Sequence, residues 1–280
     1  MRALWRAALV VAGLALACAL FGVWSAQQAP QVARYTVPLV GLATPVRIVQ
    51  LSDSHVGYDM PASRLARVVT QMNALKPDII VLTGDYISGD PDRSTAAATR
   101  AALAPFAALR APLGVYAVLG NHDSAAWTQA GFVGTGVQFL RDNSIDAGPL
   151  LIAGADDMNG PGRPVEKLRS AIRAAPIGKP LIVIAHEPDF FQWLIAPAQL
   201  VIAGHSHGGQ ILLPFIGLSG GDSYVARHLR GVFNEHGQTL VVSSGLGTSI
   251  LPMRINVPPE IVELTLVPAY SVGRKSGTDR

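Results

Sequence analysis

Short apolar runs alternate with amphipathic stretches along most of the chain. The β-rich apolar runs are residues 47–52, 79–83, 115–119, 181–185 and 200–203. Between them, residues 63–75 and 94–109 have the apolar spacing or the alanine content that is typical of covering helices. Strands that alternate with helices predict an α/β fold with helices layered over a central sheet.

The N-terminal segment has a different pattern. Residues 7–26 form a run of twenty residues without a charged side chain. A helix of that length spans about 30 Å, which is the thickness of a bilayer core, so one membrane-spanning helix is predicted. Arg2 and Arg6 precede the run and only Arg34 follows closely, which places the N-terminus in the cytoplasm and the rest of the chain outside. A cleaved signal peptide is the alternative, but Trp24 stands where its cleavage site needs a small residue.

Composition and length define the remaining organisation. The chain has 280 residues, 49% of them apolar and 15% charged, enough for one substantial core. We expect an anchor or signal with its linker at residues 1–33, a globular domain at 34–270 and a disordered polar tail at 271–280. The one cysteine, Cys18, lies in the apolar N-terminal run, so the domain has no disulfide and no thiolate metal ligand. Lys and Arg are scattered and the net charge is +3, so nucleic-acid binding is not indicated.

Polar side chains gather immediately after the apolar runs. Five of the seven histidines do so, together with two aspartates and an asparagine. These residues are Asp53, His55, Asp85, Asn121, His122, His186, His205 and His207. Because the ligand crevice of an open α/β sheet lies beyond the carboxyl ends of its strands, we expect the five loops to converge.

Each of these short motifs is ordinary alone. An aspartate after a strand often caps a helix, and Gly120-Asn121 could form only a turn. Several unpaired polar side chains at the edge of a core, however, cost free energy unless a partner satisfies them, and a cation does so. Imidazole, carboxylate and amide ligands without sulfur suit Mn, Fe, Zn or Co. The concentration of these residues therefore predicts a metal site.

The ordered motifs resemble the complete signature of the calcineurin-like metallophosphoesterases. The motifs are Asp53-x-His55, Gly84-Asp85, Gly120-Asn121-His122-Asp123, His186 and Gly204-His205-x-His207. The resemblance covers about residues 45–268, and the C-terminal motifs Ser244-Gly245-Leu246-Gly247, Pro252-x-Arg254 and Pro259-Glu260-Ile261 are similar to those of membrane-associated bacterial phosphodiesterases of that superfamily. It implies a four-layer α/β/β/α sandwich, preceded by one N-terminal transmembrane helix. The implied location is the bacterial inner (cell) membrane, with a single pass and the catalytic domain on the periplasmic or outer face.

The resemblance also implies two divalent metal ions. One ion is held by the positions that match Asp53, His55, Asp85 and His207. The other is held by those that match Asp85, Asn121, His186 and His205, so that Asp85 bridges the pair. His122 matches a position that faces the substrate as the general acid, and Asp123 either orients it or caps the following helix. Arg254 is a candidate for a contact with a substrate phosphate.

The implied activity is that of a metal-dependent phosphoesterase. Such an enzyme hydrolyses a phosphodiester or pyrophosphate bond by two-metal activation of a bridging water. Tyr86 follows Gly84-Asp85 where the phosphoprotein phosphatases continue with Asp-Arg-Gly, which argues against protein-phosphatase activity. The membrane helix favours a lipid-linked or cell-envelope substrate. Two alternatives are a UDP-2,3-diacylglucosamine-type pyrophosphatase of lipid A synthesis and a non-catalytic scaffold. A scaffold would be expected to lose ligands, and no ligand is missing. His122 would serve no purpose in a protein that only binds metal.

Overall fold

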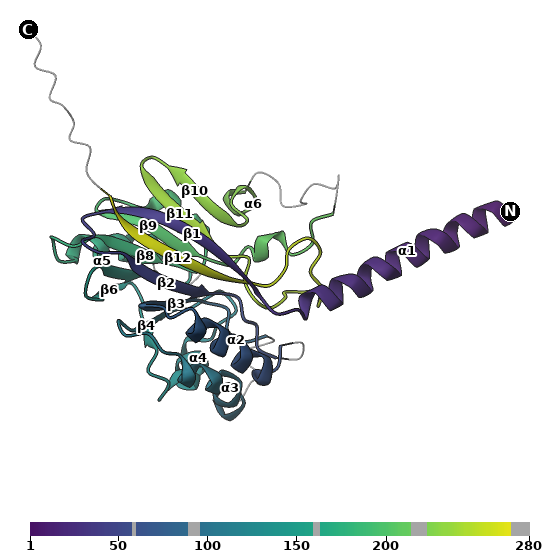
Figure 1. Cartoon of the computed structure of the whole chain (residues 1–280), viewed down its shortest axis with the longest axis horizontal. Coiled ribbons are helices and arrows are strands. Elements are labelled where there is room, and N and C mark those ends of the chain that lie inside the picture. Colours follow the sequence, from purple (N-terminus) through teal and green to yellow (C-terminus); the bar gives the residue numbers. More distant parts are fainter. Residues whose placement is uncertain (58–59, 89–95, 159–162, 214–222, 270–280) are drawn as a thin grey trace, which may run out of the picture.

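Two six-stranded sheets pack face to face, and helices cover their outer faces (Figure 1). The computed structural model describes residues 1–57, 60–88, 96–158, 163–213 and 223–269. The predicted tail at 271–280 lies outside these residues, as do positions 94–95 of the second predicted helix. The predicted α/β/β/α sandwich is confirmed.

The first sheet has the strand order β1-β12-β2-β3-β4-β5. Its strands are β1 (Gln31–Val40), β2 (Val46–Leu51), β3 (Ile79–Thr83), β4 (Val115–Val118), β5 (Gln138–Phe139) and β12 (Glu260–Ala269). The run from β2 to β5 is parallel, whereas β12 lies antiparallel to β2 and parallel to β1. The carboxyl ends of β2, β3 and β4 therefore point in one direction.

The second sheet has the order β10-β11-β9-β8-β7-β6. Its strands are β6 (Asn143–Asp146), β7 (Leu151–Gly154), β8 (Leu181–Ile184), β9 (Ala198–Ala203), β10 (Gly231–Glu235) and β11 (Gln238–Val242). The four strands from β7 to β11 along this order are parallel, with antiparallel β6 and β10 at the edges. Parallel strands buried on both faces explain the near-continuous apolar runs of the sequence.

Helices cover the outer face of each sheet. Those over the first sheet are α2 (Ala62–Ala74), α3 (Ala96–Leu103), the 3-10 helix η2 (Ala104–Ala108) and α4 (Ala125–Phe132). Those over the second are α5 (Pro164–Ala174), the 3-10 helix η3 (Pro188–Trp193) and α6 (Tyr224–Arg227), and the short 3-10 turn η4 (His207–Gly209) follows β9. The helix predicted at 94–109 is divided into α3 and η2, with Pro105 in the first turn of η2. Proline has no amide hydrogen for the α-helical ladder and so favours a break there.

The strands alternate between an inner and an outer core. On β2, Val46 and Ile48 face the second sheet, whereas Val49 and Leu51 pack under the covering helices. The last inward position, Gln50, is fully buried and lies next to the ends of the strands. Its Nε2 donates to Thr83 Oγ1 at 2.9 Å and to the carbonyl of Ala203 at 2.7 Å. This polar bridge joins the two sheets where the functional loops begin.

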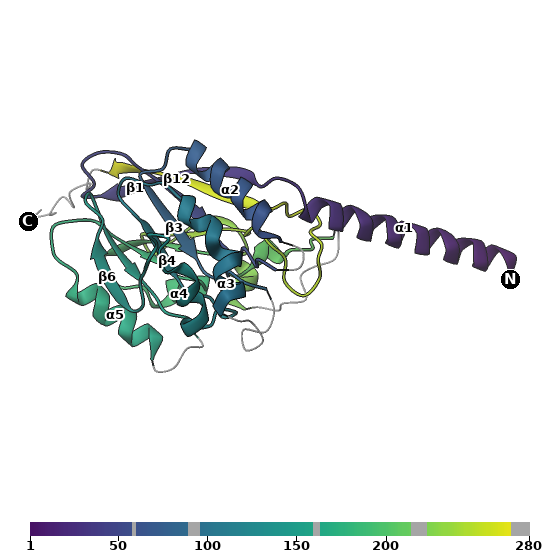
Figure 2. The ribbon, with the colours of Figure 1, turned by 90° about the horizontal axis from the view of Figure 1, so that it is seen from below.

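The N-terminal helix projects from the sandwich (Figure 2). It is α1 (Arg2–Ala26), long and apolar enough to cross a membrane, as predicted from residues 7–26. Its side chains are mostly exposed, but Gly22, Ser25 and Ala26 at its end are buried against the domain. Strand β1 begins at Gln31, so the first sheet includes residues that the sequence pattern assigned to the linker.

Candidate metal centre

All eight polar residues that follow the predicted strands meet at one end of the sandwich. Asp53 and His55 follow β2, Asp85 follows β3, and Asn121 and His122 follow β4. His186 follows β8, and His205 and His207 follow β9. Each sheet thus contributes candidate site residues to the same place, as expected for loops at the carboxyl ends of parallel strands.

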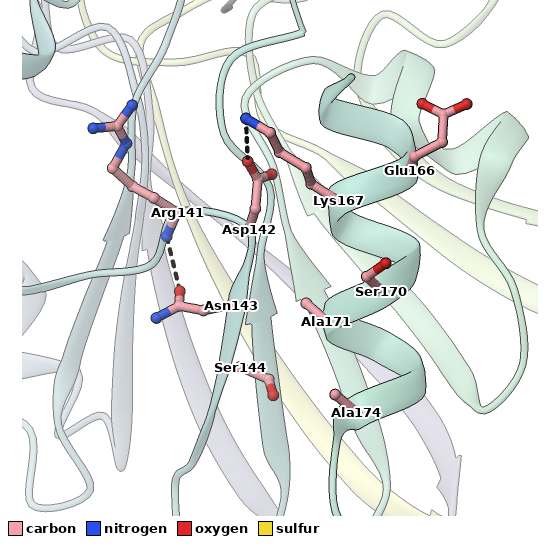
Figure 3. A pocket seen from close by; sticks show the side chains of 9 residues that line it. All are labelled: Arg141, Asp142, Asn143, Ser144, Glu166, Lys167, Ser170, Ala171 and Ala174. Atoms are coloured by element: carbon pink, nitrogen blue, oxygen red, sulfur yellow. Dashed lines mark hydrogen bonds and ion pairs between the residues drawn. The ribbon is translucent and has the colours of Figure 1, made fainter. Parts of the chain in front are cut away.

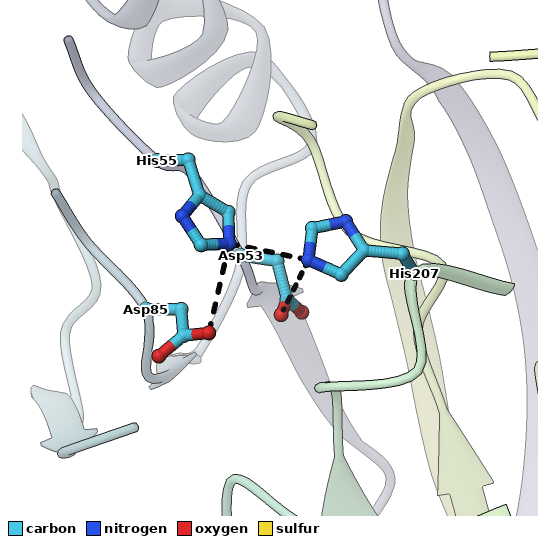
Figure 4. A group of neighbouring side chains, drawn as sticks. All are labelled: Asp53, His55, Asp85 and His207. Atoms are coloured by element: carbon cyan, nitrogen blue, oxygen red, sulfur yellow. Dashed lines mark hydrogen bonds and ion pairs between the residues drawn. The ribbon is translucent and has the colours of Figure 1, made fainter. Parts of the chain in front are cut away.

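The first cluster consists of Asp53, His55, Asp85 and His207, all buried (Figure 4). Their ligand atoms lie within 4.8 Å of one another. The Nε2 atoms of His55 and His207 are 3.1 Å apart. His207 Nε2 lies 3.4 Å from Asp53 Oδ1, and His55 Nε2 lies 3.6 Å from Asp85 Oδ2. Two nitrogens and two carboxylate oxygens therefore surround one small space.

This arrangement fits a divalent cation. The Nε2 atoms of two neutral imidazole rings lie 3.1 Å apart and face the same space as the two carboxylate oxygens, and a neutral ring nitrogen without its proton can bind a metal. Asp53 Oδ1 is buried and makes no hydrogen bond within the part of the chain that the structure describes. A buried carboxylate oxygen without a donor is costly, and a cation between it and the two nitrogens would remove that cost.

A second cluster lies on the other side of Asp85. Asn121 Oδ1 is 3.0 Å from His186 Nε2 and 3.0 Å from His205 Nδ1. The two ring nitrogens are 3.1 Å apart. Asp85 Oδ2 lies 3.3 Å from His186 Nε2 and 3.6 Å from His55 Nε2, so one carboxylate oxygen faces both clusters. Asp85 therefore lies between the two clusters, and its role as a ligand shared by two ions stays a prediction.

Backbone groups fix the orientation of these side chains. The carbonyl of Thr83 lies 2.7 Å from His186 Nδ1, so this nitrogen donates and Nε2 is directed at the cluster. Asp53 Oδ2 accepts from the amide of His205, and Asp85 Oδ1 accepts from the amide of His122. Each carboxylate is thereby left with its other oxygen for the cluster.

The loops adopt unusual backbone angles. Five of the cluster residues have a positive φ, although none is glycine. They are Asp53 (50°), His55 (42°), Asp85 (56°), His205 (69°) and His207 (50°). Such conformations cost free energy and persist where the surroundings demand them, most often at functional sites. No local sequence signal indicates these angles.

The pKa shifts within the clusters leave the carboxylate of Asp85 charged and two of the histidine rings neutral. Burial acts to raise the pKa of Asp85, but the neighbouring His186 and His55 outweigh it and hold that pKa below its ordinary value. Burial lowers the pKa of His207 to about 3 and also lowers the pKa of His55. The carboxylate of Asp85 is therefore charged and these two rings are neutral, which is the state in which they bind a cation.

His186 behaves differently from the other rings. Burial acts to lower its pKa, but the charge of Asp85 and a hydrogen bond to it reverse this and raise the pKa well above the ordinary value. Proximity to Asp85 therefore favours the protonated form of His186 when no cation is bound. A cation bound at the same place would displace that proton.

Asp123 connects the loop that carries Asp85 to the loop that begins at Gly120. Its carboxylate accepts from the amides of Asp85 (2.8 Å), Tyr86 (3.0 Å) and Gly120 (2.9 Å). Burial and the charge of Asp85 raise the pKa of Asp123 to about 7. The cap of α4 is instead Ser124, whose side chain accepts from the amide of Trp127. Of the two roles expected for Asp123, helix capping is wrong.

The ring of His122 stands at the exposed edge of the first cluster. The residue is exposed, and its ring lies edge-on to that of His55 with centroids 5.5 Å apart. Its amide donates to Asp85 Oδ1. The backbone of His122 thus orients the shared carboxylate and leaves the ring accessible from outside, where a substrate would lie.

Arg254 lies behind the centre and not at its opening. Its side chain is fully buried, and its guanidinium donates to the carbonyls of Gly247 (2.6 and 2.9 Å) and Ser244 (2.8 Å). Nη2 lies 3.5 Å from His207 Nδ1. These contacts make Arg254 a support for the loops around the first cluster. In this geometry the guanidinium donors face backbone carbonyls. The phosphate contact of Arg254 stays a prediction.

The C-terminal glycine motif brings another loop against Asp53. Gly245 has φ 72°, and a Cβ placed there would lie 2.6 Å from Asp53 Cβ. The amide of Gly247 donates to the carbonyl of Asp53 at 2.7 Å. Glycine at position 245 therefore allows this loop to approach the metal centre closely.

A separate surface pocket lies beside α5 and β6 (Figure 3). It has a volume of about 680 Å³ and is lined by none of the cluster residues. Arg141 pairs with Asp156 at 2.6 Å, and Lys167 pairs with Asp142 at 3.6 Å. Its charges are largely satisfied within the protein, so the pocket offers no alternative to the metal centre.

A four-layer sandwich that gathers Asp, His and Asn at the ends of its central strands is the architecture of a metal-dependent phosphoester hydrolase. Residues 46–209 match the family described as calcineurin-like phosphoesterase, and the chain belongs to this family. The predicted family and enzyme class are confirmed, and the buried Asp and His cluster fits divalent metal binding.

Three relatives show how far the similarity extends. The uncharacterized metallophosphoesterase YkuE of Bacillus subtilis (strain 168) is 32% identical over 232 residues, covering 79% of this chain and 78% of YkuE. Phosphodiesterase YaeI of Escherichia coli (strain K12) is 29% identical over 238 residues, covering 80% and 83% respectively. A transmembrane protein with metallophosphoesterase domain from Danio rerio is 28% identical over 277 residues, covering 89% of this chain and 60% of that protein. Helix α1 and this last similarity indicate association with a membrane.

Proposed function

We propose that this protein hydrolyses a phosphodiester or pyrophosphate bond with two divalent cations. The observation that carries the proposal is the position of Asp85, whose Oδ2 faces His55 on one side and His186 on the other. A single carboxylate between two sets of imidazole ligands is the arrangement needed for a pair of closely spaced ions.

Each ion has its own set of ligands in this proposal. Asp53, His55, Asp85 and His207 hold the first, and Asp85, Asn121, His186 and His205 hold the second. The donor set suits Mn, Fe, Zn or Co, and thiolates are absent because Cys18 lies in α1. Bound cations of this kind supply Lewis acidity, a nucleophilic water at neutral pH and compensation of phosphoryl charge.

The protein supplies the proton for the leaving oxygen. In our proposal His122 donates it, because its ring is exposed at the edge of the cluster and its backbone is held by Asp85. Hydrolysis breaks the bond between phosphorus and the leaving oxygen, and the protonated leaving group departs as an alcohol or phosphate. Asp123 keeps the two loops in register by accepting from Asp85 and Gly120.

The substrate is lipid-linked or part of the cell envelope in this proposal. Helix α1 is uncleaved and crosses the bacterial inner membrane once, with Arg2 and Arg6 in the cytoplasm and the domain on the periplasmic or outer face. Retention of α1 is supported by its contacts with the domain, since Arg254 donates its amide to the carbonyl of Gly22 at 2.9 Å. The phosphodiesterase name of the Escherichia coli relative favours a diester over a monoester.

The test uses the full chain purified in detergent with manganese. Wild type, Asp85→Asn and His122→Ala are assayed with a chromogenic phosphodiester and a chromogenic phosphomonoester, and bound metal is counted in the same samples. Asp146→Asn is the matched control, because Asp146 is exposed, forms an ion pair with Lys179 and accepts from the amide of Gly148, away from the clusters. We expect turnover to fall at least about a hundredfold in both cluster variants, while His122→Ala still binds two ions.

The opposite results are equally informative. Fewer than two ions in the saturated wild type would overturn the two-metal arrangement. Folded wild type that hydrolyses neither ester would favour a non-catalytic scaffold. Loss of a metal ion from His122→Ala would make this residue a ligand and would remove it as the proton donor.

A further inference from the structure

The membrane helix and the metal centre lie at the same end of the sandwich. Strand β1 begins at Gln31, which pairs with Glu260 at the start of β12. Two residues later on β12, Val262 pairs with Gln50 near the end of β2. Because β12 and β2 are antiparallel, the start of β1 is level with the loop that carries Asp53. Figure 1 shows α1 leaving the domain from this end of the sheets.

The junction between α1 and the domain is short and tightly held. Four residues, 27–30, separate α1 from β1. Arg64 of α2 is buried and donates to the carbonyls of Ala26 (2.7 Å) and Gln28 (3.0 Å). Gln71, also on α2, donates to the carbonyl of Pro30 at 3.0 Å. The connection is therefore fixed to α2, and the domain is held close to the end of the helix.

The loop before β12 packs on the last turns of α1. The amide of Arg254 donates to the carbonyl of Gly22, and a Cβ at Gly22 would lie 3.0 Å from Met253 Cβ. The contact falls inside the apolar run of α1, at residues 7–26, and not on a polar spacer after it. The loop is thus placed at the level where the apolar segment emerges from a bilayer.

Two large apolar side chains project from this loop. Ile250 is 100% exposed and Leu251 is 47% exposed. On the neighbouring part of α1, Phe21 and Trp24 are 51% and 59% exposed, and aromatic residues favour the membrane interface. Four exposed apolar side chains on adjacent segments form a surface that water solvates poorly.

The tip of the loop is held in a costly conformation. Ile250 has φ 62°, which is rare for a β-branched residue because its branched side chain crowds the backbone. Gln210 donates to the carbonyls of Ser249 (3.0 Å) and Leu251 (2.8 Å), on either side of the tip. Strain that is maintained by specific hydrogen bonds points to a use for the exposed side chain.

We propose that the segment 249–253 is a membrane-docking loop, in which Ile250 and Leu251 enter the interface of the bilayer that α1 spans. Docking holds the opening of the metal centre against the membrane surface. The substrate class is then an amphiphile embedded in the same membrane, with its phosphoester at the level of the head groups. This inference rests on the membrane anchor and the phosphoesterase activity proposed above.

The loop is connected directly to the metal centre. Arg254 follows the tip and donates to the carbonyl of Gly247, and the amide of Gly247 donates to the carbonyl of Asp53. Insertion of Ile250 therefore sets the height of the cluster above the bilayer through a short chain of hydrogen bonds.

Depth of insertion is measured first, without any reference to activity. Ile250→Cys is made in the full chain with Cys18→Ser, labelled with a polarity-sensitive fluorophore and reconstituted into vesicles that contain a lipid-borne quencher. Ile177→Cys is the matched control, because Ile177 is equally exposed but precedes β8, at the end of the sandwich opposite His186. We expect quenching and a blue shift at position 250 and neither at 177. Equal quenching at the two positions would overturn the docking loop.

Activity is measured next with two substrates. Ile250→Glu combined with Leu251→Glu is compared with wild type in vesicles, using a water-soluble chromogenic diester and a phosphodiester lipid. We expect the soluble diester to be hydrolysed at an unchanged rate and turnover of the lipid to fall at least about tenfold, because charged side chains partition poorly into the interface. Equal effects on the two substrates would contradict the inference. Wild type inactive on both would contradict the proposed function, while the quenching result would stand by itself.

Discussion

His186 Nδ1 lies 2.7 Å from the carbonyl oxygen of Thr83. Thr83 ends β3 in the first sheet, whereas His186 follows β8 in the second. One sheet therefore orients a candidate metal ligand that the other sheet carries. The packing of the two sheets, and not only the local loops, sets the geometry of the centre.

Removing this ligand should affect one ion more than the other. We expect His186→Gln to bind about one manganese ion per chain where wild type binds two, because the first cluster keeps all four of its own ligands. Elemental analysis of the dialysed full chain measures the ratio. His236→Gln is the control, since His236 is exposed and distant in sequence from every cluster residue. A variant that retains two ions would show that His186 is not a ligand.

Metal removal should destabilise the domain. Ligand at a hundredfold excess over its Kd stabilises a protein by about 2.7 kcal/mol, which for a domain of this size corresponds to roughly 5–10 °C in Tm. We expect Tm to rise by that amount when manganese is added to chelator-treated protein. The rise should be much smaller in Asp53→Asn, which loses a buried charged oxygen of the first cluster. An equal rise in both proteins would place the stabilising ion elsewhere.

Asp123 should be a major source of stability. Asp123→Ala leaves three amide donors, those of Asp85, Tyr86 and Gly120, without their acceptor. We expect a loss of at least about 3 kcal/mol in unfolding free energy, because three buried donors lose their acceptor and each costs roughly 1–3 kcal/mol. Urea titration of the metal-free chain measures it. Asp146→Ala, which removes an exposed ion pair with Lys179, should cost less than about 1 kcal/mol.

Acid should weaken the metal-free fold through His207. Its pKa is about 3 in the folded protein and 6.5 in an ordinary environment, so the unfolded chain binds the extra proton between these values. Unfolding free energy therefore falls as pH drops below about 6.5, by at most about 1.4 kcal/mol per pH unit from this residue. His207→Gln should show a shallower fall between pH 6.5 and 4.5 in urea titrations. An unchanged slope would mean that His207 does not remain neutral in the folded state.

Arg254→Lys separates structural support from substrate contact. Lysine cannot reproduce the fork of donors to Gly247 and Ser244, so we expect a lower Tm and weaker manganese binding. A residue that only contacts the substrate phosphate would instead raise KM and leave Tm and metal affinity unchanged. Thermal denaturation and steady-state kinetics of the same preparation distinguish the two outcomes.

The strands and the place of the candidate site could be predicted from the sequence because the candidate ligands follow buried strands. Arg254 could not be placed in this way, since its acceptors come from carbonyls of other loops and leave no side-chain signal. The positive φ of Asp53 and His55 is likewise imposed by tertiary contacts.

Strand β1 was not among the predicted elements for a related reason. Only Val37 and Leu39 of its ten residues are buried, and its partner β12 lies more than two hundred residues further along the chain. Local periodicity carries no information about such a pairing. A truncated protein that begins at residue 34 would lack the first residues of β1. A truncation that removes α1 should therefore begin before Gln31.

The position of β12 has a consequence for how the protein is made. It lies between β1 and β2 and pairs with both, so the first sheet is incomplete until the final strand has been synthesised. Until then β2 presents an open edge, and the loop that begins at Gly245 and packs against Asp53 is itself synthesised only shortly before β12. Contacts between segments that are so far apart in the sequence form slowly. The metal centre is therefore completed late, after most of the chain has left the ribosome and with α1 already available for the membrane.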